Sequence, residues 1–174
     1  IYGGVENIEG MDFVRQLNDA VHENTKAFMI AEDSSITAGV TVPTKDKGFG
    51  FDFKWNLGWM NDTLKYFKKD PVFRKYHHGK ITYTYDYAFT ENFILVLSHD
   101  EVVHLKHPML EKMPGEIEEK FSGLKALYAL QFTSPGKKLL FMGQDFAEDR
   151  EWDEKREINW AFANDFGHRD VLQC

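Results

Sequence analysis

The sequence predicts an α/β fold built around a mostly parallel sheet, and three observations support this prediction. Short apolar runs suited to buried strands alternate with segments of helical periodicity, as strand–helix–strand crossovers require. Three of these runs end in polar residues that include Glu32, Asp100 and Asp145. The length of 174 residues suffices for one domain with a sizeable core. Residues 1–174 are therefore expected to lie within one domain.

The amino-terminal half is expected to fold as a helix, two strands and a second helix. Apolar residues recur at helical spacing in both helical segments, as at Met11, Val14 and Val21. The first strand is a short apolar run, taken as buried, that ends in Glu32 and Asp33, whereas the second alternates aromatic with other residues. Between these two strands, a segment that contains glycine and proline and shows no helical or strand periodicity predicts a loop. The expected ranges are 10–24 (helix), 27–33 (strand), 34–48 (loop), 49–56 (strand) and 57–70 (helix).

The carboxyl-terminal half is expected to continue with a strand, a helix and a strand. Five consecutive apolar residues, Phe93–Leu97, are too few for a typical helix and predict a strand buried on both faces. A helical pattern follows from Ile117 to Gln131 and is ended by a Ser-Pro-Gly turn. A further buried strand is predicted over 137–146, and a small helix around 83–89.

Acids at the carboxyl ends of several parallel strands resemble the active face of a TIM barrel. A complete barrel needs about 250 residues and eight strands, whereas four strands are predicted here. The sequence therefore predicts half of a (β/α)8 barrel. Such a half leaves 27–33 and 137–146 as unpaired, apolar edge strands, so self-association is expected.

Composition argues against several classes of protein. A formal net charge of −7 opposes the basic surface that general nucleic-acid binding needs. No apolar run approaches the about 18 residues of a membrane span, so no membrane partner is expected. The one cysteine, Cys174, permits no internal disulfide and suits a reducing compartment, which favours a cytoplasmic protein. Because the first residue is Ile1 and not methionine, we expect a piece of a longer protein.

Glu32 and Asp100 are the candidate catalytic pair. In a barrel, both strand ends would face one pocket, and paired carboxylates suit glycoside chemistry. One carboxyl group protonates the departing oxygen, while another stabilises or attacks an oxocarbenium-like centre. The alternative is that strand-end acids cap a following helix or pair with surface lysines. From the residues alone, both interpretations stay open.

The histidines near Asp100 do not fit a metal site or a catalytic triad. His99 and His104 are five positions apart after a strand, whereas the zincin pattern needs two histidines four apart on one helix. A Ser98-His99-Asp100 triad is disfavoured because adjacent strand residues point to opposite faces. We therefore expect no metal.

Five stretches carry a resemblance to a known family: "MIAEDSSITAGVT", "GFGFDFKWNLGWMNDTLKYFKKDP", "FRKYHHGKITYTYDYAFTENFILVLSHDEVVH", "KMPG" and "PGKKLLFMGQDFAEDREW". They resemble the bacterial 1,4-alpha-glucan (glycogen) branching enzymes of the alpha-amylase superfamily, glycoside hydrolase family 13. The resemblance covers nearly the whole chain. It implies that residues 1–174 form the carboxyl-terminal half of the catalytic (β/α)8 barrel domain.

The resemblance also implies a reaction. An alpha-1,4 glucan is cleaved and the cut chain is transferred to a 6-hydroxyl, which forms an alpha-1,6 branch in glycogen biosynthesis. The mechanism is retaining and needs neither a metal nor an organic cofactor. The partner is an alpha-glucan. The alternatives are an amylase-type hydrolase, a non-catalytic glucan-binding module, and a folded piece without a function of its own.

Individual residues acquire roles by the same resemblance. Glu32 matches the general acid/base, Asp100 the carboxylate that stabilises the transition state, and His99 a substrate-binding donor that supports the same charge. The nucleophilic aspartate of the family lies in a D-G-x-R-x-D motif that this sequence lacks, so the chain alone is expected to be inactive. The sequence departs from the family at Leu105, where many members have glycine, and at Asp145, where they usually have glutamate.

Overall fold

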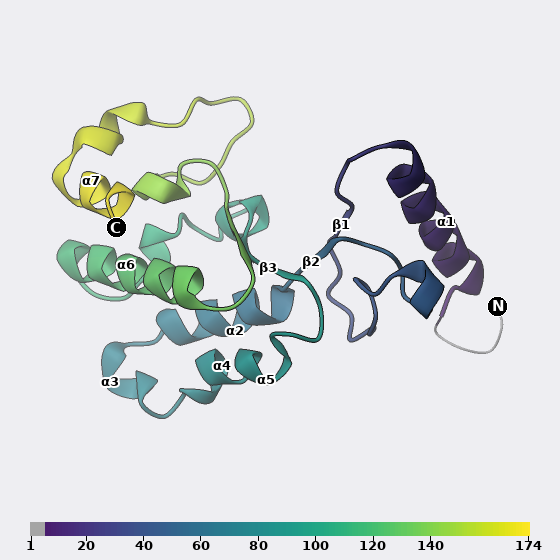
Figure 1. Ribbon diagram of the computed structural model, residues 1–174. Helices are drawn as coiled ribbons and strands as arrows, with labels where there is room; N and C mark the ends of the chain where they lie inside the picture. Colours follow the sequence, from purple (N-terminus) through teal and green to yellow (C-terminus); the bar gives the residue numbers. More distant parts are fainter. Residues whose placement is uncertain (1–5) are drawn as a thin grey trace.

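The computed structural model of the chain describes residues 6–174. Within that range, four parallel strands form one sheet in the order β1-β2-β3-β4, which is also their order along the chain (Figure 1). The predicted α/β class and the parallel sheet are confirmed. The strands are β1 (Ile30–Ala31), β2 (Phe53–Trp55), β3 (Phe93–Leu97) and β4 (Lys137–Leu140).

Helices connect and flank these strands. The helices predicted over 10–24, 57–70 and 117–131 are confirmed as α1, α2 and α6. The Asn56 side chain accepts a hydrogen bond from the Trp59 amide at the start of α2, and Asp70 caps α3 with Pro71 in its first turn. The α-helices of residues 6–174 are α1 (Ile8–Asn24), α2 (Leu57–Phe67), α3 (Pro71–Arg74), α4 (Gly79–Thr82), α5 (Thr84–Tyr87), α6 (Ile117–Thr133) and α7 (Phe166–Leu172).

The main hydrophobic core lies between β3 and the helices α2 and α6. All five residues of β3 are buried, and Leu95 and Leu97 pack with Leu124 and Leu127 of α6 and with Trp59 of α2. This central strand has a hydrogen-bonded neighbour on each side. The buried strand predicted for 93–97 is therefore confirmed, and its first and last residues are those predicted. Among the described helices, none combines the length and apolar character needed to cross a membrane.

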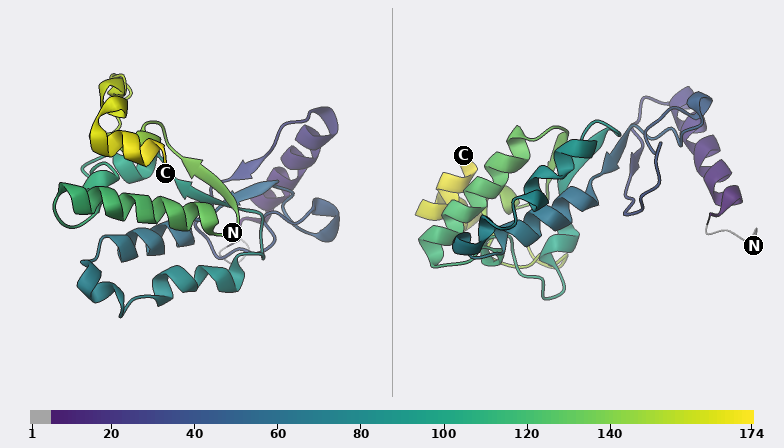
Figure 2. Two further views of the ribbon diagram at one scale, coloured as in Figure 1. Left: turned by 60° about the vertical axis from the view of Figure 1, so that its left-hand side comes forward. Right: turned by 90° about the horizontal axis from the view of Figure 1, so that it is seen from below.

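Helix α1 and the loop between β1 and β2 form a smaller lobe that projects beyond the sheet, as both views in Figure 2 show. Helix α1 is attached to the loop that precedes β2. The buried Asn18 side chain donates to the Phe49 carbonyl at 2.8 Å, and Arg15 donates to the Gly48 carbonyl at 3.1 Å. Gly48 has no room for a side chain, because a Cβ there would lie 2.0 Å from the Val42 carbonyl oxygen.

The outer strands are shorter and more exposed than the sequence predicts. Only Ile30–Ala31 of the range 27–33 pairs as a strand, and Phe28 and Ile30 are exposed. Of 137–146, only Lys137–Leu140 is a strand, and it is not fully buried. The prediction of two buried strands is wrong here because each of these strands pairs with a neighbour on one side alone in the described sheet.

Candidate functional site

The three predicted site residues all lie at the carboxyl edge of the sheet, but they do not form one cluster. Glu32 follows β1 directly, whereas His99 and Asp100 belong to a 3-10 helix (His99–Val102) directly after β3. His99 Nε2 lies 3.3 Å from Asp100 Oδ1. β2 separates β1 from β3, and the register places Ala31 level with Phe93 through Lys54, so Glu32 is offset from His99 both across the sheet and along the strands.

A tight turn presents Asp100 to solvent. The buried Glu101 carboxylate accepts hydrogen bonds from the Ser98 amide at 2.6 Å and the Ser98 hydroxyl at 2.8 Å. The Ser98 Oγ in turn accepts from the Asp100 amide at 3.2 Å. This capping box bends the chain from β3 into the 3-10 helix. Ser98 is thus engaged with Glu101, and the rejected Ser98-His99-Asp100 triad is absent among the described contacts.

Two aromatic rings hold the His99 imidazole. Its ring centroid lies 5.8 Å from that of Phe141, just after β4, and 5.7 Å from that of Trp152 in the following segment. Phe141 and Trp152 also pack edge to face at 5.2 Å. Sequence reasoning gave neither ring a role, because nothing in the local pattern marks which aromatic side chains meet at a strand end.

His99 and Asp100 line an open cavity of about 770 Å³, within the usual range for ligand sites. The opposite side comes from the segment after β4, which carries Arg150, Glu151 and Trp152. Charged and hydrogen-bonding groups surrounding one aromatic face suit a ligand rich in hydroxyl groups. The other lining residues are Val103, His104, Leu105, Asp153, Glu154 and Arg156.

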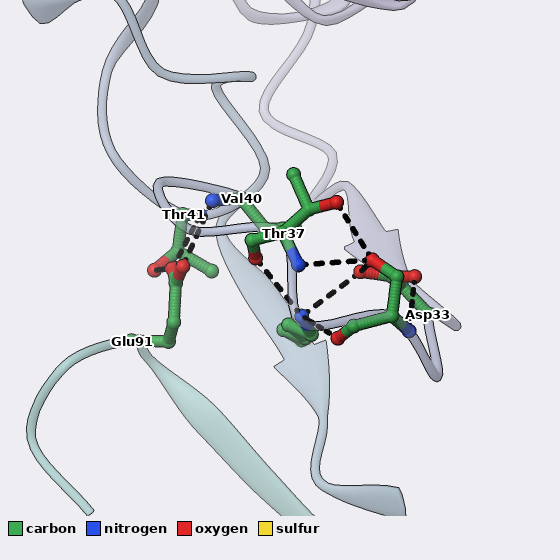
Figure 3. A network of polar contacts seen from close by, with 7 residues as sticks. Asp33, Thr37, Val40, Thr41 and Glu91 are labelled. Carbon is green, nitrogen blue, oxygen red and sulfur yellow. Dashed lines mark hydrogen bonds and ion pairs between the residues drawn. The ribbon is translucent and has the colours of Figure 1, made fainter. Parts of the chain in front are cut away.

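Glu32 lies outside this cavity and is exposed, whereas its neighbour Asp33 is engaged in an ion pair. The buried Lys54 ammonium lies 2.9 Å from Asp33 Oδ2 and also reaches the carbonyls of Ser35 and Thr37 (Figure 3). Burial alone would raise the pKa of Asp33, but hydrogen bonds from Lys54 and Ser35 hold it below its ordinary value. The alternative interpretation, in which a strand-end acid pairs with a lysine, thus applies to Asp33. For Glu32, residues 6–174 provide no such partner.

The loop after Glu32 is anchored to the beginning of β3. The Glu91 carboxylate accepts hydrogen bonds from the amides of Val40 and Thr41, at 2.9 and 2.7 Å, and from the Thr41 hydroxyl at 2.5 Å (Figure 3). Burial acts to raise the pKa of Glu91, but these hydrogen bonds outweigh it and lower the pKa. An anionic Glu91 therefore orders the loop that leads away from Glu32.

Asp145, the third strand-end acid of the sequence prediction, does not face Asp100. It is exposed and lines a different, largely apolar cavity with Tyr128 and Leu140. Residues 6–174 contain no cluster of three or more histidine, cysteine, aspartate or glutamate side chains placed to hold a metal ion.

A parallel α/β sheet with a carboxylate, an imidazole and an open polar cavity at its carboxyl edge has the features of an α/β enzyme. No family model matches the chain. Its sequence is 48% identical, over 99% of its length, to the 1,4-alpha-glucan branching enzyme GlgB of Shewanella frigidimarina. The identity is 50% over 98% of the chain for GlgB of Nitrosospira multiformis, and 49% over 98% for GlgB of Aquifex aeolicus.

The chain spans only about a quarter of these relatives: 24% of the Shewanella enzyme, 23% of the Nitrosospira enzyme and 27% of the Aquifex enzyme. The resemblance drawn from the sequence motifs is confirmed. The chain corresponds to one segment of the 1,4-alpha-glucan branching enzymes.

Proposed function

We propose that the chain is part of a 1,4-alpha-glucan branching enzyme, which cleaves an alpha-1,4 glucan and transfers the cut chain to a 6-hydroxyl to form an alpha-1,6 branch. One observation carries this proposal: about half of the residues are identical to enzymes of that name over 98–99% of the chain. The carboxyl-edge location of Glu32, His99 and Asp100 supports it.

The same proposal includes the architecture of the whole domain. Each connection leads from one strand to the strand next to it in the sheet, so the strands lie side by side in chain order, as they do around a (β/α)8 barrel. Residues 1–174 would then be the carboxyl-terminal half of the catalytic barrel domain. The free sides of β1 and β4 would pair with strands from the rest of the protein.

In this mechanism, Glu32 is the general acid/base. It protonates the departing glycosidic oxygen and later takes the proton from the acceptor 6-hydroxyl, as a retaining mechanism requires. Asp100 and His99 hold the sugar and stabilise the positive charge that develops on its ring. The nucleophile, about 5 to 5.5 Å from the acid/base, comes from another part of the protein.

A segment exchange tests the proposal. In the Aquifex aeolicus relative, the matching segment is replaced by this chain, and branching is measured by iodine staining followed by debranching. We expect the chimera to form branches and Glu32→Gln to lower the rate by about 10²- to 10⁴-fold. Glu23→Gln, an exposed change on α1, is the matched control. A folded chimera that releases reducing ends without forming branches would identify a hydrolase instead.

The isolated chain should be inactive and should self-associate. Its exposed Phe28, Ile30 and Met142 lie on or beside the strands β1 and β4, whose outer sides have no strand partner among residues 6–174. Light scattering at micromolar concentration should detect dimers or larger species. A dispersed monomer, or branching activity that exceeds a Glu32→Gln control, would contradict this part of the proposal.

A further inference from the structure

The segment His104–His107 has an unusual backbone beside the cavity that Asp100 lines. His104, Leu105 and His107 have φ values of 53°, 65° and 66°, in the left-handed region that residues other than glycine seldom occupy. Packing does not impose this conformation on Leu105, whose side chain is 86% exposed. The conformation must therefore be held by contacts that the backbone itself makes.

Glu151 makes two of these contacts from the segment after β4. Its Oε2 accepts a hydrogen bond from the Leu105 amide at 3.1 Å, and its Oε1 accepts one from the His107 amide at 2.6 Å. The hydrogen bond from the His107 amide is the main cause that lowers the pKa of Glu151 below its ordinary value. One carboxylate thus joins two amides of this segment to a residue more than 40 positions later.

Lys112 holds the carbonyl side of the same segment. This lysine is only 7% exposed, and its ammonium donates to the carbonyls of His107, at 2.8 Å, and Lys106. Lys106 in turn donates from Nζ to the Asp100 carbonyl at 2.7 Å. The segment is therefore bound by an anion at its amides and by a cation at its carbonyls, and it also contacts the backbone of Asp100.

These contacts determine the shape of the cavity. His104 and Leu105 form its wall next to His99 and Asp100, and Glu151 is itself part of the lining. If the two Glu151 hydrogen bonds were lost, the left-handed residues would relax toward ordinary backbone conformations and the wall would move.

We infer that Glu151 is a positioning residue. Together with Lys112, it holds His104–His107 in place as one wall of the cavity that receives an alpha-1,4 glucan beside Asp100. The identity of the ligand rests on the proposed function. The backbone clamp rests only on the contacts described above. The two parts can therefore be tested separately.

Amide hydrogen exchange tests the clamp. Glu151→Gln keeps the shape of the side chain but leaves one oxygen acceptor where the carboxylate has two. We expect the amides of Leu105 and His107 to exchange at least about tenfold faster in this variant, while the amides of α6 stay unchanged. Glu154→Gln is the matched control, because Glu154 lines the same cavity and accepts no hydrogen bond from the described residues of this segment. Equal exchange in Glu151→Gln and the control would overturn the clamp.

Titration with maltoheptaose, a linear alpha-1,4 glucan, tests the positioning role. The titration uses the branching chimera described above, and tryptophan fluorescence should report binding. Glu151→Gln in the chimera should need about tenfold more maltoheptaose for half saturation than the unmodified chimera or its Glu23→Gln variant, whose change lies on α1 and outside this cavity. Unchanged binding by Glu151→Gln, with the unmodified chimera binding maltoheptaose, would overturn the positioning role alone. A folded chimera that failed to bind maltoheptaose would overturn the glucan assignment on which the proposed function depends.

Discussion

Because Lys112 is buried, the free energy of unfolding of the chain should increase in alkaline solution. Burial lowers the pKa of this lysine from 10.5 to about 8, and repulsion from Lys68 adds to the effect, against attraction from Glu101 and Glu151. The folded chain therefore releases this proton at a lower pH than the unfolded chain does. Between pH 8 and 10.5 the unfolded state holds more protons, so the free energy of unfolding rises with pH. At 1.36 kcal/mol for each pKa unit, the full change is about 3 kcal/mol.

Urea unfolding at pH 7 to 10.5 measures this change against Lys112→Met, which lacks the titrating group. The wild-type free energy of unfolding minus that of the variant should rise by about 3 kcal/mol across this range. Lys65→Met, which removes an exposed lysine from the lining of a neighbouring cavity, controls for the loss of one positive charge. A difference between wild type and Lys112→Met that stays constant within about 1 kcal/mol would refute the argument from burial.

Three further predictions concern the backbone and its anchors. Leu105→Gly should stabilise the chain by up to about 1 kcal/mol, because glycine adopts a φ of 65° without steric cost; a lower urea midpoint would contradict this. Glu91→Gln should destabilise it by about 2 kcal/mol. Because the pKa of Glu91 is lowered, this difference should be present above pH 4.5 and diminish as the pH falls below it. Gly48→Ala should cost at least about 3 kcal/mol, since its Cβ would overlap a carbonyl oxygen. Gly79→Ala, with open space around it, should be nearly neutral by the same urea assay.

The order of the elements and the strongest of them were predictable from the sequence. The strand Phe93–Leu97 and the helices α2 and α6 match their predicted ranges closely, because continuous apolar runs, helical periods and proline stops are local signals. The helices α3, α4 and α7 were missed. Two of them have four residues and α7 has seven, so none presents enough turns for a period to be visible.

The sequence by itself also indicated that Glu32 and Asp100 follow strands, since a residue that follows an apolar run can be read directly, but it was wrong for Asp145, which lies five positions beyond the end of β4. Only the tertiary structure decided which of those acids share a cavity. Asp100 faces Trp152 and Glu151 across it, Glu32 lies two strands away, and Asp145 faces elsewhere. The reason is physical: these groupings depend on strand order, on the bend after β3 and on the left-handed segment that Glu151 holds. Such contacts join residues more than 40 positions apart, and no local pattern encodes them.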